Sequence, residues 1–333
     1  MRIVHRLVTV ALMSLALFGS PAVAEAQTPA RLFVFGDSLS DTGNDLLATL
    51  ATPTPIPPPQ MYAQGRFSNG PVTFEYLWSM LSGRQPFIAP SLSLSGQPLP
   101  PAGAVSFAFG GAGSGVVTVV QGFQVPGLQT QIAMFQAALR GQPAPADALY
   151  AIWVGSNDYE KGPGEAVLPP ATVVGNIADA VGALYGLGAR DILVVNLPDL
   201  GASPSVLLDS AQRELLSALT TAHNKLLAKT MREIEKRLPG LTIIDGDAAK
   251  FVKRARHELV DALPLIDTLV GPLPGGLPAS ECRVVAPALC PAVPSFEPDA
   301  PFLFWDNQHP TTAADERFAE VLFTAVTKAL RHP

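Results

Sequence analysis

Residues 31–44 read RLFVFGDSLSDTGN, and the interpretation of the whole chain starts from this stretch. The apolar run Arg31–Phe35 has the composition of a strand, and the Gly-Asp-Ser that follows it is typical of a loop. The run is apolar at successive positions, which favours a strand that is covered on both faces of its sheet. Ser38 is therefore predicted to present its hydroxyl on the loop at the end of a buried strand.

The rest of the chain alternates between predicted strands and predicted helices. Short runs rich in Val, Ile, Leu and Phe, bounded by turn-forming residues, predict further strands at Ala104–Phe109, Ala148–Val154, Asp191–Asn196 and Leu241–Ile244. Helical spacing of apolar residues predicts helices at Val72–Leu81, Leu128–Leu139, Thr172–Leu187, Ala211–Leu238 and Ala313–Leu330. Such alternation implies parallel strands with right-handed crossovers, so the predicted fold is an α/β three-layer α/β/α sandwich with a mostly parallel central sheet.

Length and composition fit one large globular domain at residues 27–333. The chain has 333 residues, of which 48% are hydrophobic and 15% charged, and this excludes a disordered protein. Two Pro-rich segments, Pro53–Pro59 and Pro264–Pro301, are interpreted as loop insertions, because motifs needed for one site lie on both sides of each. The second insertion either walls the site or is a passive surface loop.

The first 26 residues are predicted to be a secretory signal peptide. Arg2 and Arg6 precede an apolar run at Leu7–Phe18, and Ala24-Glu25-Ala26 has small residues where a signal peptidase cleaves. The alternative is an uncleaved anchor. No later stretch reaches the roughly 20 apolar residues of a membrane helix. We therefore expect a protein without a transmembrane segment after cleavage, either secreted or periplasmic.

The charge balance argues against a nucleic-acid partner. There are 22 Lys and Arg against 28 Asp and Glu, a net charge of −6, and removal of the signal peptide makes it one unit more negative. Phosphate binding depends on Lys and Arg, and no basic cluster is present in the sequence. The two cysteines, Cys282 and Cys290, are predicted to form a disulfide in the exported protein, since no His or second Cys pair has metal-ligand spacing.

His309 is the best candidate for a base that activates Ser38. A serine hydroxyl is a weak nucleophile unless a base lies within hydrogen-bond reach and a third group orients that base. Only His309 combines a loop position, a helix just after it and a nearby acid, Asp306. The other histidines lie near the chain ends, inside a predicted helix or among charged residues: His5, His223, His257 and His332.

Asp306 has two possible roles. It can orient His309 through the ring Nδ1, or it can cap the helix that begins near Thr311, although Thr311 or Thr312 suits the capping role better.

A tetrahedral intermediate also needs donors for its oxyanion. Three are available: the Ser38 N–H, an N–H of the glycine turn after the second strand, and the Asn157 amide.

Four motifs in order carry a resemblance to the SGNH, or GDSL, hydrolase family of secreted bacterial esterases and lipases. They are GDSLSDTGN at 36–44, SFAFGGAG at 106–113, GSND at 155–158 and DNQH at 306–309. The resemblance implies Ser38 as nucleophile, His309 as base and Asp306 as acid. It implies Gly111 and Asn157 as oxyanion donors with the Ser38 N–H, and Gly110 is the second choice. Ser106 stands where an asparagine is expected, and GRFSNGP at 65–71 also matches but has no assigned role.

The predicted function is hydrolysis of carboxylic esters through a Ser-His-Asp triad and an acyl-enzyme, without a metal or organic cofactor. The chain lacks the Gly-x-Ser-x-Gly elbow of α/β-hydrolases and the glycine patterns of nucleotide-binding loops. An acyltransferase of the same family and a non-catalytic binding domain on the same fold are the alternatives. The substrate is expected to be a small or lipid-like ester; its acyl and alcohol parts and the oligomeric state are left open.

Overall fold

A computed structural model describes residues 28–120, 122–161, 165–206, 209–260 and 303–331, and its centre is a six-stranded sheet of order β2-β3-β1-β6-β7-β8. Every neighbouring pair in this sheet is parallel, which confirms the predicted sheet. Its strands are β1 Arg31–Gly36, β2 Ala89–Pro90, β3 Gly103–Ser106, β6 Ala148–Trp153, β7 Asp191–Val195 and β8 Thr242–Gly246. The strands β4 Val117–Val120 and β5 Phe123–Pro126 form a separate antiparallel hairpin.

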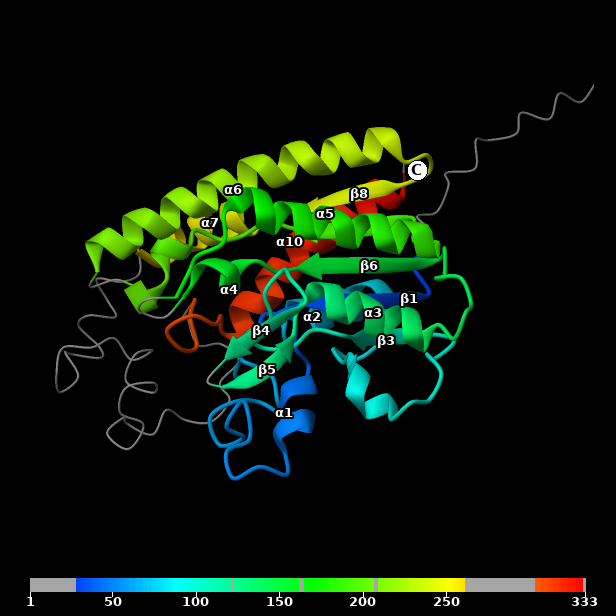
Figure 1. The fold of residues 1–333 in the computed structure, drawn as a ribbon, viewed down its shortest axis with the longest axis horizontal. Coiled ribbons are helices and arrows are strands. Elements are labelled where there is room, and N and C mark those ends of the chain that lie inside the picture. The colour runs from blue at the N-terminus through cyan, green and yellow to red at the C-terminus, as the bar shows by residue number, and fades with distance from the viewer. Residues whose placement is uncertain (1–27, 121, 162–164, 207–208, 261–302, 332–333) are drawn as a thin grey trace, which may run out of the picture.

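Helices cover both faces of the sheet, so the three-layer α/β/α sandwich is confirmed (Figure 1). One face is covered by α3 Leu128–Ala138, α5 Pro170–Leu187 and α6 Ser210–Arg237. The other is covered by α2 Thr73–Ser82, α7 Ala248–Val260 and α10 Thr312–Leu330. The short helices are α1 Asn44–Thr49, α4 Ser156–Tyr159 and the 3-10 turns η1 Ser91–Leu94, η2 Leu200–Ala202 and η3 Pro204–Val206.

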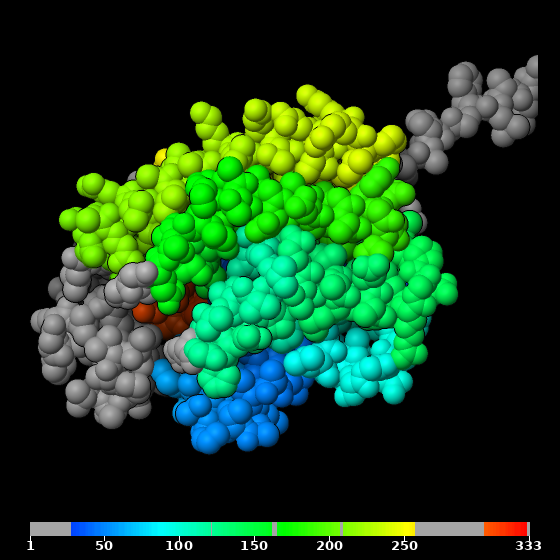
Figure 2. All heavy atoms as spheres, viewed as in Figure 1, coloured from blue at the N-terminus to red at the C-terminus, as the bar shows by residue number. Residues whose placement is uncertain are grey.

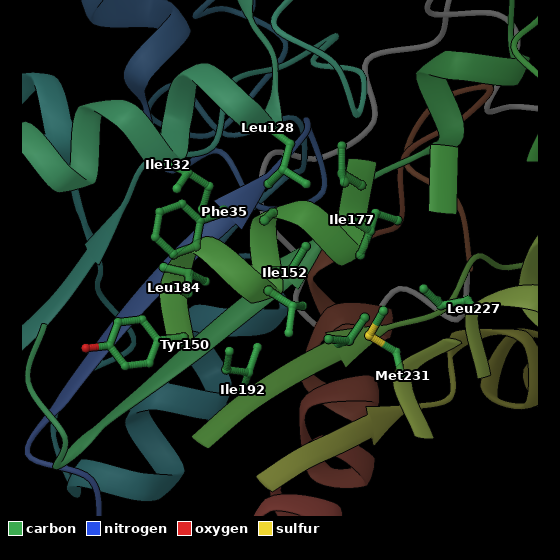
Figure 3. Packing of buried hydrophobic residues seen from close by; sticks show 14 of the residues in the cluster. Phe35, Leu128, Ile132, Tyr150, Ile152, Ile177, Leu184, Ile192, Leu227 and Met231 are labelled. Atoms are coloured by element: carbon green, nitrogen blue, oxygen red, sulfur yellow. The ribbon is translucent and has the colours of Figure 1, made fainter. Parts of the chain in front are cut away.

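The strands are apolar at successive positions because each face of the sheet has its own core. Phe33 and Phe35 of β1 point to the helices α3, α5 and α6, whereas Leu32 and Val34 point to α2 and α10. Figure 3 shows Phe35 with Leu128, Ile132 and their neighbours in the first of these cores. Full burial of each such side chain contributes roughly 1.5–3 kcal/mol, which holds the helices on the sheet.

The beginning of α10 is set by a side-chain cap. Thr311 is the N-cap residue, and its hydroxyl accepts a hydrogen bond from the Ala314 N–H at 3.2 Å. This satisfies one of the N–H groups that an α-helix leaves free at its start. His309 therefore lies on the loop immediately before the helix, as the sequence predicts.

Besides the short β2, α4 and the 3-10 turns, the elements that were not predicted are the two strands of the β4–β5 hairpin, α1 and α7. The residues of β4 and β5 other than Val125 are exposed or partly exposed, although β4 reads Val-Thr-Val-Val, a β-branched run typical of a strand. The predicted strand Ala104–Phe109 is regular only as far as Ser106. Beyond it, the Phe107 and Phe109 N–H groups still donate to carbonyls of the β1 segment, at 2.7 and 3.3 Å.

Several predictions concern residues outside the described ones. These are the signal peptide at 1–26, the Pro264–Pro301 insertion and the Cys282–Cys290 disulfide, and they stay predictions. Among the helices of the described residues, none has both the length and the hydrophobicity needed to cross a bilayer.

Candidate active site

Ser38 lies in the tight turn that follows β1. The Asp37 carbonyl accepts hydrogen bonds from the N–H groups of Ser40 and Asp41, each at 3.0 Å, and the Asp37 carboxylate accepts from the Leu39 N–H at 3.1 Å. A Cβ on Gly36 would collide with the Trp153 carbonyl oxygen of β6, so the turn needs glycine at its start. This turn holds Ser38 at the carboxyl edge of the sheet, partly open to solvent.

The three residues implied by the Ser-His-Asp pattern meet at this edge. The His309 Nε2 lies 2.8 Å from the Ser38 Oγ, and the His309 Nδ1 lies 2.7 Å from the Asp306 Oδ2. Both distances are those of hydrogen bonds. The chain therefore brings a hydroxyl from its first strand against an imidazole from the loop before its last helix.

Asp306 faces the imidazole, and the helix that follows is capped by another residue. Its Oδ1 accepts hydrogen bonds from the Gln308 and His309 N–H groups, at 2.8 and 2.7 Å. Its Oδ2 accepts from the Tyr62 hydroxyl at 2.7 Å in addition to facing the imidazole. Thr311 has the capping role instead. The carboxylate is thus held by four contacts, and it can favour the His309 tautomer that leaves Nε2 free to accept a proton.

Asp306 and His309 each favour the charged form of the other. Burial raises the pKa of Asp306, but the charge of His309 and the hydrogen bonds to the carboxylate outweigh burial and lower it to about 2. Burial lowers the pKa of His309, and the charge of Asp306 and its hydrogen bond more than offset this, so the pKa lies above its usual value. A base of this kind can accept a proton and retain the resulting charge beside a carboxylate.

The predicted oxyanion donors lie on two loops beside Ser38. The Gly110 N–H donates a hydrogen bond to the Asp41 Oδ2 at 3.2 Å, so it is not available to an oxyanion. For the Gly111 N–H, no acceptor is found within the described residues, which favours Gly111 over Gly110 as a donor. The Asn157 amide donates one hydrogen to the Ala112 carbonyl at 3.0 Å and retains a second one. Asn157 lines the cavity at Ser38, whereas Gly111 is not among its lining residues, so the role of Gly111 stays a prediction.

Side-chain contacts tie the first two motifs together. The Asp41 carboxylate accepts the N–H groups of Gly43, Asn44 and Asp45 as well as that of Gly110. The hydroxyl of Ser106, at the position where an asparagine was expected, donates to the Ser40 carbonyl at 2.9 Å. Serine at this position therefore links β3 directly to the turn that carries Ser38.

Tyr62 and Phe67 complete the site, and the sequence analysis assigned neither of them a role. Tyr62 bonds the Asp306 carboxylate, and the Phe67 ring packs against the His309 ring with 5.2 Å between centroids. A Cβ on Gly110 would collide with the Phe67 ring, which explains the glycine there. The sequence signal that could have indicated Phe67 was the GRFSNGP segment at 65–71, which contains this residue.

The same segment also fixes the loop before α10. Arg66 forms a buried, two-pronged ion pair with Glu75 of α2, with both N···O distances at 2.7 Å. The Asn69 Oδ1 accepts the Thr312 N–H at 2.8 Å, and the Ser68 hydroxyl donates to the Pro310 carbonyl at 3.0 Å. Residues 66–69 therefore hold the chain on the C-terminal side of His309.

The cavity at Ser38 and His309 is largely apolar. Its lining includes Phe251, Leu303, Phe304 and Phe318, together with several carboxyl groups. Figure 2 shows orange atoms of the C-terminal segment at the bottom of a hollow in the molecular surface. Burial raises the pKa of two acids near His309, Asp37 and Glu160, to about 7. Such a cavity suits an uncharged, apolar substrate group.

His223, the other histidine with a described environment, lies in the core and not in the cavity at Ser38. It is fully buried in α6, and its Nδ1 lies 2.9 Å from the Tyr159 hydroxyl. Burial lowers its pKa to about 4. Its ring packs behind Gly155 and so supports the loop that carries Asn157. Within the described residues there is no group of three or more His, Cys, Asp or Glu that could hold a metal ion.

Comparison with known proteins gives a consistent set of relatives. The family model described as GDSL-like Lipase/Acylhydrolase matches residues 32–322. A phosphatidylcholine-sterol acyltransferase of Aeromonas hydrophila is 31% identical over 61% of this chain, a match that spans 55% of that relative. A GDSL esterase/lipase of Arabidopsis thaliana is 25% identical over 95% of this chain and 92% of its own length. An extracellular lipase of Streptomyces rimosus, a solved structure, is 15% identical with a TM-score of 0.41, covering 89% of this chain and 99% of that one.

Proposed function

The chain belongs to the GDSL-like lipase/acylhydrolase family, and from this membership we propose that it is an exported carboxylic ester hydrolase with a serine nucleophile. The observation that carries the proposal is the pair of hydrogen bonds that runs from Ser38 through His309 to Asp306. This arrangement supplies both requirements of an activated serine, a base in contact and an acid that orients the base.

The reaction follows from these contacts. Ser38 attacks the ester carbonyl while His309 takes its proton, and the charge on His309 is balanced by Asp306. The Ser38 and Gly111 N–H groups and the Asn157 amide receive the oxyanion, each donor contributing roughly 3–4 kcal/mol. His309 then protonates the departing alcohol, and a water molecule activated by the same imidazole releases the acid.

Hydrolysis of p-nitrophenyl acetate tests the proposal. Ser38→Ala should lower kcat/KM by more than about a thousandfold, because the nucleophile is lost. Its thermal unfolding should remain close to that of the native protein, since Ser38 is partly exposed. A fluorophosphonate should label the native protein but not the variant. Retained turnover in Ser38→Ala would contradict the mechanism, and a native protein that is neither active nor labelled would favour the non-catalytic binding domain.

Acyl transfer to an alcohol is the second candidate. It is favoured by the similarity to the Aeromonas protein named as a phosphatidylcholine-sterol acyltransferase. An acyltransferase would form a new ester when an alcohol acceptor competes with water. Product analysis with a sterol or glycerol acceptor separates this activity from simple hydrolysis.

Substrate class and location complete the proposal. The apolar cavity lining supports lipid-like or small uncharged esters, and a chain-length series of nitrophenyl esters extended to a phospholipid tests this. Export is supported by the sequence of residues 1–26, which has the parts of a signal peptide. N-terminal sequencing of the expressed protein should then begin at Gln27, and fractionation separates periplasm from medium.

A further inference from the structure

The β4–β5 hairpin exposes an unusual amount of apolar surface. Its outer face carries Val117 and Val119, whose neighbours across the strand pair are Pro126 and Gln124. Val116 and Val119 are each 63% exposed, Val117 is 48% exposed and Phe123 is 43% exposed. These four side chains, Val116, Val117, Val119 and Phe123, are named the hairpin patch. Scattered exposed apolar residues are normal, but four of them within the eight residues 116–123 of one hairpin are typical of a contact surface.

Exposed apolar side chains are concentrated around the glycine turn that contains Gly110 and Gly111. Within the described residues ten large hydrophobic side chains are exposed, and six lie on or beside the hairpin and α1: Val116, Val117, Val119, Phe123, Leu47 and Leu50. Both elements contact the glycine turn that carries Gly111, since Val120 packs on Gly111 and Asp45 of α1 packs on Gly110. Both elements therefore border the turn that carries the predicted oxyanion donor Gly111.

Charge distinguishes this region from the rest of the chain. The sequence contains no Lys, Arg, His, Asp or Glu between Arg84 and Arg140, a stretch that includes the whole hairpin and the glycine turn. The complete chain has a net charge of −6. An uncharged apolar surface on an acidic protein matches a lipid layer without net charge, whereas an anionic layer would repel the protein as a whole.

The hairpin is also anchored to the active-site loops. The Thr118 hydroxyl accepts the Gly113 N–H at 2.8 Å, and Val125 packs with Phe109 and Ala112 in a small apolar cluster. The face that carries Thr118 and Val125 is therefore packed on the glycine turn, and the opposite face, which carries Val117 and Val119, is turned away from it. Figure 2 shows the blue-green surface of this part of the chain on the same side of the molecule as the hollow with the orange C-terminal atoms.

We propose that the hairpin patch is a docking surface that holds the protein on lipid layers of no net charge, with the mouth of the catalytic cavity facing the lipid. The inference rests on the proposed ester hydrolase function, and it specifies that aggregated, uncharged or zwitterionic lipids are the preferred substrates. Insertion of the valines into the lipid removes their methyl groups from water, which supplies the binding free energy.

Flotation with phosphatidylcholine vesicles tests the proposal in the Ser38→Ala background, where the lipid is not hydrolysed. The triple change Val116→Thr, Val117→Thr and Val119→Thr keeps β-branched side chains, so the hairpin should still form. It should weaken vesicle binding by roughly tenfold or more, because each change replaces a methyl group by a hydroxyl and so removes the free energy gained when that methyl group leaves water. The matched control is Val321→Thr on α10, also an exposed valine, which should bind as the parent does.

A second variant separates docking from a structural role of the hairpin. Val119→Lys should weaken binding to phosphatidylcholine vesicles and strengthen binding to vesicles that contain phosphatidylglycerol, a change of preference that a merely structural effect does not produce. Both hairpin variants, with Ser38 restored, should hydrolyse p-nitrophenyl acetate at the native rate.

Three results would overturn the inference. One is a native protein that cleaves the soluble ester but does not bind phosphatidylcholine vesicles; this leaves the proposed function intact. Another is vesicle binding that neither variant changes. The third is a dimer, measured by light scattering, that the triple variant dissociates, because the patch would then belong to a second copy of the chain.

Discussion

Replacement of Asp306 by asparagine keeps the shape of the side chain but changes which nitrogen of His309 carries the proton. In the native site the Asp306 Oδ1 accepts the backbone N–H groups of Gln308 and His309, and the Oδ2 faces the His309 Nδ1. An asparagine must keep its oxygen at the position where two N–H groups donate. Its NH₂ group then faces Nδ1 and donates to it, so the ring proton moves to Nε2 and Ser38 loses its base.

The size of the activity loss follows from the contacts that would break if the amide introduced at position 306 turned round and pointed its NH₂ group at the backbone N–H groups. Reversal places the NH₂ group against two partly buried N–H donors, which costs roughly 2 kcal/mol or more in unsatisfied donors. The inactive tautomer should therefore dominate, and kcat/KM should fall by about three orders of magnitude, in the range for loss of general-base assistance. The carboxylate also raises the pKa of His309. Because the unprotonated imidazole is the active form, the acidic limb of the residual activity should move to lower pH.

The assay is kcat/KM for p-nitrophenyl acetate over pH, compared with thermal unfolding of the same variant. Thr311→Ala is the matched control, since it removes the N-cap of α10 next to the site. It should cost roughly 1 kcal/mol of stability and leave turnover close to the native value. If Asp306→Asn instead retained turnover and lost only stability, the residue would be structural and the reasoning above would be wrong.

Three further outcomes are expected. Tyr62→Phe removes one hydrogen bond from the Asp306 carboxylate and should lower kcat for the soluble ester by up to about tenfold with KM unchanged. Arg66→Met leaves the buried Glu75 carboxylate without its ion-pair partner and should cost about 3–5 kcal/mol in denaturant unfolding. His223 has a folded-state pKa of about 4 against an ordinary value of 6.5. The unfolded chain binds more protons between these values, so the free energy of unfolding should decrease as pH falls through that window, and His223→Gln should flatten the slope.

The parts of the fold that could be predicted are those with a local signal. The strand Arg31–Gly36 is apolar at every buried position, and the Ser38 loop and the DNQH motif are each contiguous in sequence. Tyr62 could not be predicted in this way, because its partner Asp306 lies 244 residues away and nothing in the sequence around it indicates a contact. The hairpin was missed although residues 116–120 read VVTVV, a β-branched run that is typical of a strand; in the fold this run is partly exposed, unlike the buried central strands.

The relative position of Ser38 and His309 depends on contacts that neither residue makes. The hydroxyl of Thr73 in α2 donates to the Asp315 carboxylate at 2.6 Å, and the hydroxyls of Tyr76 and Thr312 lie 2.8 Å apart. Together with the Asn69 contact to Thr312, these bonds fix α10 against α2 and thereby fix the loop that precedes it. Since α2 itself packs on the sheet face that contains β1, the imidazole is positioned through a continuous set of buried contacts. A hydrogen bond between residues 271 apart in sequence is therefore maintained by the packing of the second core, and the geometry of the candidate site is a property of the folded sheet and its helices.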